Sequence, residues 1–116
     1  MVALTIGMAT YDDYDGVYFT IQALRLYQDL TNTEILVVDN FGCDETEKFV
    51  RSVPNARYLR ATEVVGTAVR DLVFRHARGD AVLCVDSHIL FPPGTIARLR
   101  DYYATHPETW DLLQGP

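Results

Sequence analysis

Residues 80–94, DAVLCVDSHILFPPG, decide the fold. The segment begins with an apolar run, 81–85, that contains no charge and is typical of a strand covered on both faces of a sheet. The Pro-Pro-Gly sequence at 92–94 ends the extended segment and begins a helix, because proline is tolerated in the first helical turn. We therefore expect the polar residues 86–88 to lie where a central strand leaves its sheet.

Two of these polar residues, Asp86 and His88, are of types that bind metals. Side chains two residues apart point the same way when the backbone is extended, so both can reach one ion. A single Asp-x-His, taken alone, is more typical of a surface turn in which the aspartate caps the turn and the histidine is solvated. The rest of the chain has to decide between these two interpretations.

The hydrophobic pattern alternates between strands and helices along the whole chain. The pattern predicts strands at 4–9, 34–38, 56–60, 81–85 and 110–114, and helices at 17–30, 44–52, 65–76 and 95–105. In the first helix we expect one stripe to face the core: Phe19, Ala23, Leu26, Tyr27 and Leu30. This order predicts a single α/β domain over 1–116, with a mostly parallel, Rossmann-like sheet between two helical layers.

Bulk composition excludes several classes of protein. The 116 residues carry a net charge of −6, which argues against nucleic acid as a partner. The apolar runs are too short to span a bilayer, and no basic leader precedes the first strand, so we expect a cytoplasmic protein. Cys43 and Cys84 do not have zinc-site spacing.

Polar residues follow three of the predicted strands: Tyr11 with Asp12, then Asp39, then Asp86 with His88. In open parallel sheets, ligands bind beyond the carboxyl ends of the strands. Carboxylates and an imidazole there would hold a divalent cation, which would in turn hold a diphosphate. The mixed donor set favours manganese. The sequence has no Gly-x-Gly-x-x-Gly after the first strand and no Gly-Lys-Ser/Thr, which argues against dinucleotide and P-loop folds.

Several segments resemble the inverting family-2 glycosyltransferases, which have the GT-A fold. Residues 38–46, VDNFGCDET, resemble their Val-Asp-Asp/Asn-x-Ser-x-Asp-x-Thr signature, and 9–12, ATYD, resemble their Pro-Thr-Tyr-Asn. Arg-Asp at 70–71 and Ala-Arg-Gly-Asp at 77–80 match further motifs. Asp-Ser-His at 86–88 takes the place of Asp-x-Asp and is similar to the motif of polypeptide N-acetylgalactosaminyltransferases. The resemblance covers nearly the whole chain.

This resemblance implies the donor-binding half of a GT-A glycosyltransferase, which uses a nucleotide-diphosphate sugar, expected to be a UDP-sugar, and a divalent metal, Mn²⁺ in preference to Mg²⁺. It implies the following roles: Asp39 binds the base, Thr10 and Tyr11 flank the nucleotide, Arg70 and Asp86 lie near it, and Asp86 and His88 hold the metal. The acceptor and the catalytic base are not identified. We expect the acceptor half of the enzyme to lie beyond this segment, so the 116-residue chain alone should be inactive.

Two other functions remain open from the residues alone. One is a non-catalytic module that binds a nucleotide or a metal, and the other is a nucleotidyltransferase with a related sheet. Among the remaining polar residues, we expect Asp13 to be a solvated loop residue and His76 to be packed on an apolar helical stripe.

Overall fold

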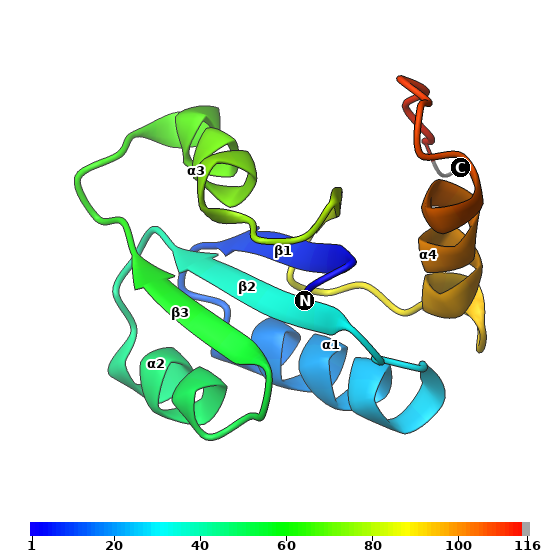
Figure 1. Ribbon diagram of the computed structural model, residues 1–116. Coiled ribbons are helices and arrows are strands. Elements are labelled where there is room, and N and C mark those ends of the chain that lie inside the picture. Colours follow the sequence, from blue (N-terminus) through cyan, green and yellow to red (C-terminus); the bar gives the residue numbers. More distant parts are fainter. Residues whose placement is uncertain (115–116) are drawn as a thin grey trace.

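A four-stranded parallel sheet with helices on both faces forms the framework. The computed structural model describes residues 1–114. Its elements are β1 (Leu4–Thr10), α1 (Tyr14–Tyr27), β2 (Thr33–Asp39), α2 (Asp44–Arg51), β3 (Ala56–Arg60), a 3₁₀ turn (Gly66–Ala68), α3 (Val69–His76), β4 (Ala81–Val85) and α4 (Thr95–Thr105). The strand order is β3-β2-β1-β4, and all three pairings are parallel. Helices α1 and α2 cover one face and α3 covers the other (Figure 1), which confirms the predicted α/β architecture.

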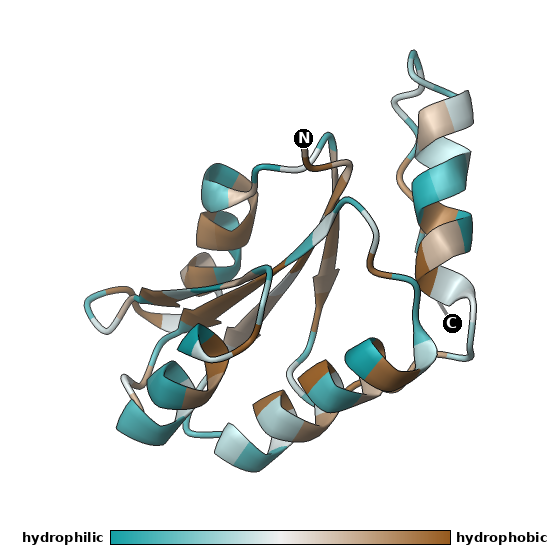
Figure 2. Cartoon of the chain, turned by 60° about the horizontal axis from the view of Figure 1, so that its bottom comes forward, coloured by the Kyte–Doolittle hydropathy of each residue, from teal (hydrophilic) through white to brown (hydrophobic). Residues whose placement is uncertain are grey.

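The two central strands, β1 and β2, carry most of the core. On the α1 and α2 side, Ile6 and Val37 pack in a cluster with Ile21. On the α3 side, Leu36 and Val73 belong to a second cluster. The strands are accordingly mostly hydrophobic in Figure 2, whereas the helices alternate between hydrophobic and hydrophilic residues. No helix within residues 1–114 combines the length and apolarity needed to cross a membrane.

Strand β4 lies at the edge of this sheet, so the prediction of a central, fully covered strand was wrong. Within residues 1–114 it pairs with β1 alone, and its five residues are only half-buried. The predicted strand at 110–114 does not form among the described residues. This segment instead folds back on α4, where the Tyr103 hydroxyl donates to the Asp111 carbonyl at 3.0 Å. A cavity of about 760 Å³ lies between β4 and this segment, so the two segments that would have to pair are apart.

Helix α1 faces the sheet with a different side from the one predicted. The helix buries Val17, Thr20, Ile21 and Leu24. Phe19 and Leu26, which we expected in the core, are 69% and 74% exposed. At 100° per residue, the centres of the predicted and the buried stripes lie roughly 130° apart around the helix. The phase is set by tertiary contacts, because the buried side of α1 carries Thr20, whose hydroxyl bonds to the segment after β4.

Helix α3 crosses β1 at very close range. A Cβ atom placed on Gly7 would lie 2.2 Å from Cγ1 of Val73, so only glycine allows this approach. The contact joins the core of α3 to the strand that leads into Tyr11. His76, at the end of the same helix, is exposed and is not packed as predicted.

We expect Gly7→Ala to lower the free energy of unfolding by about 1–3 kcal/mol, the usual cost of overpacking a core. Val73→Ala should also destabilise, by leaving a cavity. The double variant should lose less stability than the sum of the two single variants, because alanine at 73 removes the clashing methyl group. Urea unfolding of the four proteins measures this coupling. Strict additivity would show that β1 and α3 are not in tight contact.

Candidate functional site

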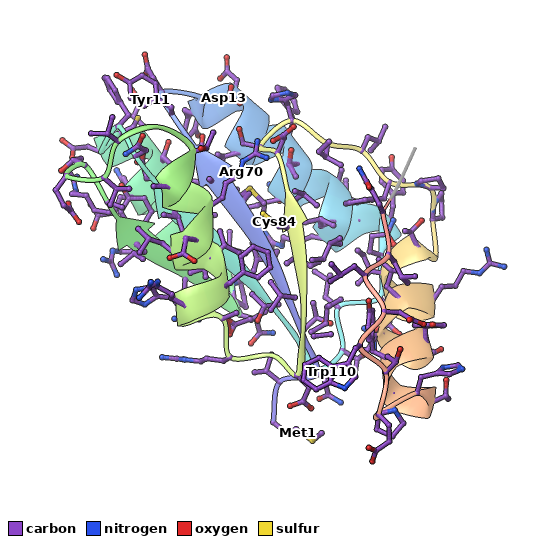
Figure 3. The ribbon with its side chains drawn as sticks, turned by 90° about the horizontal axis from the view of Figure 1, so that it is seen from above. Met1, Tyr11, Asp13, Arg70, Cys84 and Trp110 are labelled. Carbon is purple, nitrogen blue, oxygen red and sulfur yellow. The ribbon has the colours of Figure 1, made fainter. Side chains whose placement is uncertain are left out.

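A cavity of about 490 Å³ lies at the carboxyl ends of β1 and β4. Its lining consists of Ala9, Tyr11, Asp12, Asp13, Asp86, Ser87 and His88. Two of the three polar clusters predicted from the sequence therefore meet in one place, 74 residues apart along the chain. In Figure 3, Tyr11 and Asp13 lie at one end of the molecule, while Met1 and Trp110 lie at the opposite end. The cavity is at the sheet edge where doubly wound α/β folds bind ligands.

Asp86 is held by an arginine from the neighbouring helix. Nη2 of Arg70, in the first turn of α3, lies 3.0 Å from Oδ1 of Asp86. Both side chains are more than half exposed, and exposed ion pairs contribute at most about 1 kcal/mol. A ligand that attracts the carboxylate more strongly can therefore separate them at small cost.

His88 and Ser87 are directed toward Asp13 rather than toward Asp86. The Ser87 hydroxyl donates to Oδ2 of Asp13 at 2.7 Å, and Nδ1 of His88 lies 3.5 Å from the same oxygen. The hydrogen bond from Ser87 lowers the pKa of Asp13, assisted by the Gly16 N–H and by His88, and together they outweigh the opposing effect of burial. Asp13 is thus bonded into this site. Our expectation that it would be a solvated loop residue was wrong.

The sequence contained one sign of this role. Asp13 is the N-cap of α1, and its Oδ1 accepts the N–H of Gly16 at 3.2 Å. An aspartate immediately before the first helical residue is a typical N-cap. The contacts with Ser87 and His88 join residues 74 and 75 positions away, which no local pattern can indicate.

The predicted metal ligands fit an ion only in part. Among residues 1–114, no three His, Cys, Asp or Glu side chains are gathered into a metal-binding group. Asp86 and His88 nevertheless line the same cavity, and both side chains are more than half exposed. A carboxylate and an imidazole suit a borderline divalent cation that takes its other ligands from a diphosphate or water. The donor set therefore fits a shared ion and not a cage made by the protein alone.

An aromatic pair stands beside the cavity. Tyr11 and Phe41 lie beyond the ends of β1 and β2, with ring centroids 5.2 Å apart and an edge-to-face arrangement. Both rings are exposed. Thr10, in contrast, is buried and does not line the cavity, and its hydroxyl has no hydrogen-bond partner among the described residues. The sequence motifs do not point to Phe41, because its position beside Tyr11 depends on the pairing of β1 with β2.

Asp39 lies beneath its own loop and not in the cavity. Its side chain accepts the N–H groups of Phe41, Gly42 and Cys43 at 2.8–3.0 Å. The Tyr58 hydroxyl donates a fourth bond at 2.6 Å. Burial, together with this bond, raises the pKa of Tyr58 above its ordinary value. A carboxylate has about four acceptor positions, so a base can reach Asp39, which is 1% exposed, only by replacing one of these donors.

Comparisons with solved structures identify proteins of similar fold. No curated protein matches the chain significantly. A mannosyltransferase from Pyrobaculum calidifontis, PcManGT, solved with GDP-Man and Mn²⁺, is 25% identical with a TM-score of 0.73, over 87% of this chain and 32% of that one. S. aureus TarS 1–349, solved with UDP-GlcNAc, is 19% identical with a TM-score of 0.72, over 97% of this chain and 37% of that one.

These matches support the fold and fix the family. The chain spans about a third of the length of both solved structures. Their similarity lies in the four-stranded parallel sheet and its helices, which correspond to the N-terminal half of the GT-A fold. Residues 5–112 match the glycosyl transferase family 2. The chain therefore belongs to glycosyl transferase family 2, as its sequence motifs suggested.

Proposed function

We propose that this chain is the donor-binding part of a glycosyltransferase and binds a nucleoside-diphosphate sugar in the cavity beyond β1 and β4. The observation that carries the proposal is that Tyr11, Asp86 and His88 line one cavity at the ligand-binding edge of the sheet. The family match and a relative solved with GDP-Man and Mn²⁺ support a nucleotide sugar and a metal. We propose a UDP-sugar as the donor and Mn²⁺ in preference to Mg²⁺.

Two side chains that line the cavity, and an arginine that contacts one of them, are suited to the diphosphate. Asp86 and His88 would hold the cation, which neutralises charge on the diphosphate when bound. Arg70 already contacts Asp86, so its guanidinium is placed to donate to a phosphate oxygen once Asp86 binds the cation instead. Such local positive charge is needed because the chain as a whole carries a net charge of −6.

The base would lie beside Tyr11 and Phe41. Exposed aromatic rings offer apolar faces on which a planar base can stack, and stacking is worth about 1–3 kcal/mol for each base. Asp39 would contribute in two ways. It orders the loop that carries Phe41, and it can accept a hydrogen bond from the base if the base replaces the Tyr58 hydroxyl as donor. Transfer to an acceptor is proposed for the whole enzyme, and this chain alone is expected to bind donor without transferring sugar.

Calorimetry with UDP and with GDP, each with and without Mn²⁺, tests the metal role. We expect UDP to bind more tightly with Mn²⁺, and both His88→Ala and Asp86→Asn to reduce this gain by about tenfold, equivalent to 1.4 kcal/mol. His88→Asp restores an Asp-x-Asp pattern with a harder ligand, so it should keep the gain and shift preference toward Mg²⁺.

His76→Ala is the matched control, because His76 is exposed and lies outside the cavity. It should bind UDP and Mn²⁺ like the parent. A parent that binds UDP equally well with and without Mn²⁺ would refute the metal role of Asp86 and His88. Tighter binding of GDP than of UDP would change the proposed base and leave the site in place.

A second pair of variants separates the two roles of Asp39. Asp39→Asn should lower the free energy of unfolding by about 1–3 kcal/mol, because an amide nitrogen cannot accept the bonds of the loop. Tyr58→Phe removes only one donor and frees one acceptor position. If the base bonds to Asp39, Tyr58→Phe should keep or improve UDP affinity while Asp39→Asn weakens it. An Asp39→Asn variant with parental stability, measured by urea unfolding, would contradict the structural role.

A further inference from the structure

A buried hydroxyl on α1 makes two hydrogen bonds to the backbone of the segment after β4. Oγ1 of Thr20 donates to the Ser87 carbonyl at 2.9 Å and accepts the Ile89 N–H at 3.1 Å. Thr20 is 2% exposed, so neither bond is shared with bulk water. The backbone on both sides of His88 is therefore fixed by one side chain of a helix 67 residues earlier in the sequence.

The first turn of α1 adds two further contacts to the same segment. Asp13 accepts the Ser87 hydroxyl at 2.7 Å while it also caps α1. Gly16 lies directly under Ser87: a Cβ atom there would be 2.6 Å from the Ser87 carbonyl oxygen and 2.1 Å from Oδ2 of Asp13. Asp13, Gly16 and Thr20 thus lie on one side of α1, about one turn apart, and all three contact the residue between Asp86 and His88.

These contacts matter because β4 offers little support of its own. It is an edge strand with a half-buried pattern, and residues 86–94 after it contain no helix or strand. Ser87 uses its hydroxyl and its carbonyl to bind α1, which leaves the side chains on either side of it free to line the cavity. A ligand pair needs support of this kind, since partners behind metal ligands typically affect affinity by about 10–100-fold.

We propose that Asp13, Gly16 and Thr20 form a clamp that positions Asp86 and His88 for the cation. The inference rests on the proposed function, because it assumes that these two residues hold the metal. The clamp residues are positioning residues and not ligands. They should govern the gain in UDP affinity that Mn²⁺ provides. Thr20, which is buried and does not line the cavity, should leave the metal-free affinity unchanged.

The test compares Thr20→Val with Thr20→Ser. Valine keeps the shape of threonine but loses both hydrogen bonds, while serine keeps the hydroxyl. We expect Thr20→Val to lower the Mn²⁺-dependent gain in UDP affinity by about tenfold, with metal-free UDP affinity as in the parent, and Thr20→Ser to restore the gain. Calorimetry gives both affinities, and electron paramagnetic resonance of Mn²⁺ gives the bound fraction directly.

Thr105→Val is the matched control, because the Thr105 hydroxyl also bonds to backbone carbonyls but lies at the end of α4. It should keep the parental gain. Ser87→Ala gives a second test: it removes the hydroxyl that Asp13 accepts, while Asp13 can still cap α1 through the Gly16 N–H. This variant should lose the Mn²⁺-dependent gain in UDP affinity as Thr20→Val does, and it still tests the clamp if Thr20→Val does not fold.

Three outcomes would overturn the proposal. If the parent gains affinity from Mn²⁺ and Thr20→Val or Ser87→Ala gains as much, the clamp is refuted and the metal site stands. If Thr20→Val loses metal-free and metal-dependent affinity equally, the contacts serve the fold and not the ion. A parent that gains nothing from Mn²⁺ refutes the proposed metal role, and the clamp with it, before any variant is compared.

Discussion

Strand β1 is bonded in parallel to β2 on one side and to β4 on the other, and the rest of the structure depends on this pairing. The register places Thr10 beside Asp39 and Met8 beside Val85. The loops after all three strands therefore leave the sheet at one edge. Tyr11, Phe41 and Asp86 reach the same end of the molecule although they are far apart in sequence. The tight contact of Gly7 with Val73 fixes the same strand against α3, which carries Arg70.

The polar side chains at this edge divide into two groups with different tasks. The carboxylate oxygens of Asp39 and Asp13 accept hydrogen bonds from backbone N–H groups and hydroxyls. These bonds stabilise the loops after β2 and β4. Asp86 and His88 are exposed to the cavity and have weak partners. A carboxylate whose acceptor positions are all used inside the protein cannot bind a ligand without an exchange, whereas an exposed one can. The aspartates that look alike in the sequence therefore have different chemistry.

Much of the fold could be predicted because parallel strands have a nearly continuous apolar pattern, as in residues 35–38 and 81–85. The cluster of Tyr11, Asp86 and His88 followed from the topology alone. The side of α1 that faces the core could not be predicted, since the stripe containing Phe19 is as apolar as the one containing Val17. The edge position of β4 and the missing strand at 110–114 depend on pairing partners, which sequence periodicity does not reveal. The bonds of Asp13 and Asp39 are likewise tertiary contacts.

The central claim is that donor and metal meet in the cavity beyond β1 and β4. Amide resonances measured by NMR during titration with Mn²⁺ and UDP test it most directly, because the unpaired electrons of Mn²⁺ broaden signals of nearby nuclei. The account predicts strong broadening at residues 11–13 and 86–88, which line this cavity. Broadening centred instead on the cavity at the opposite edge strand, lined by Arg51, Arg57 and Tyr58, would contradict it.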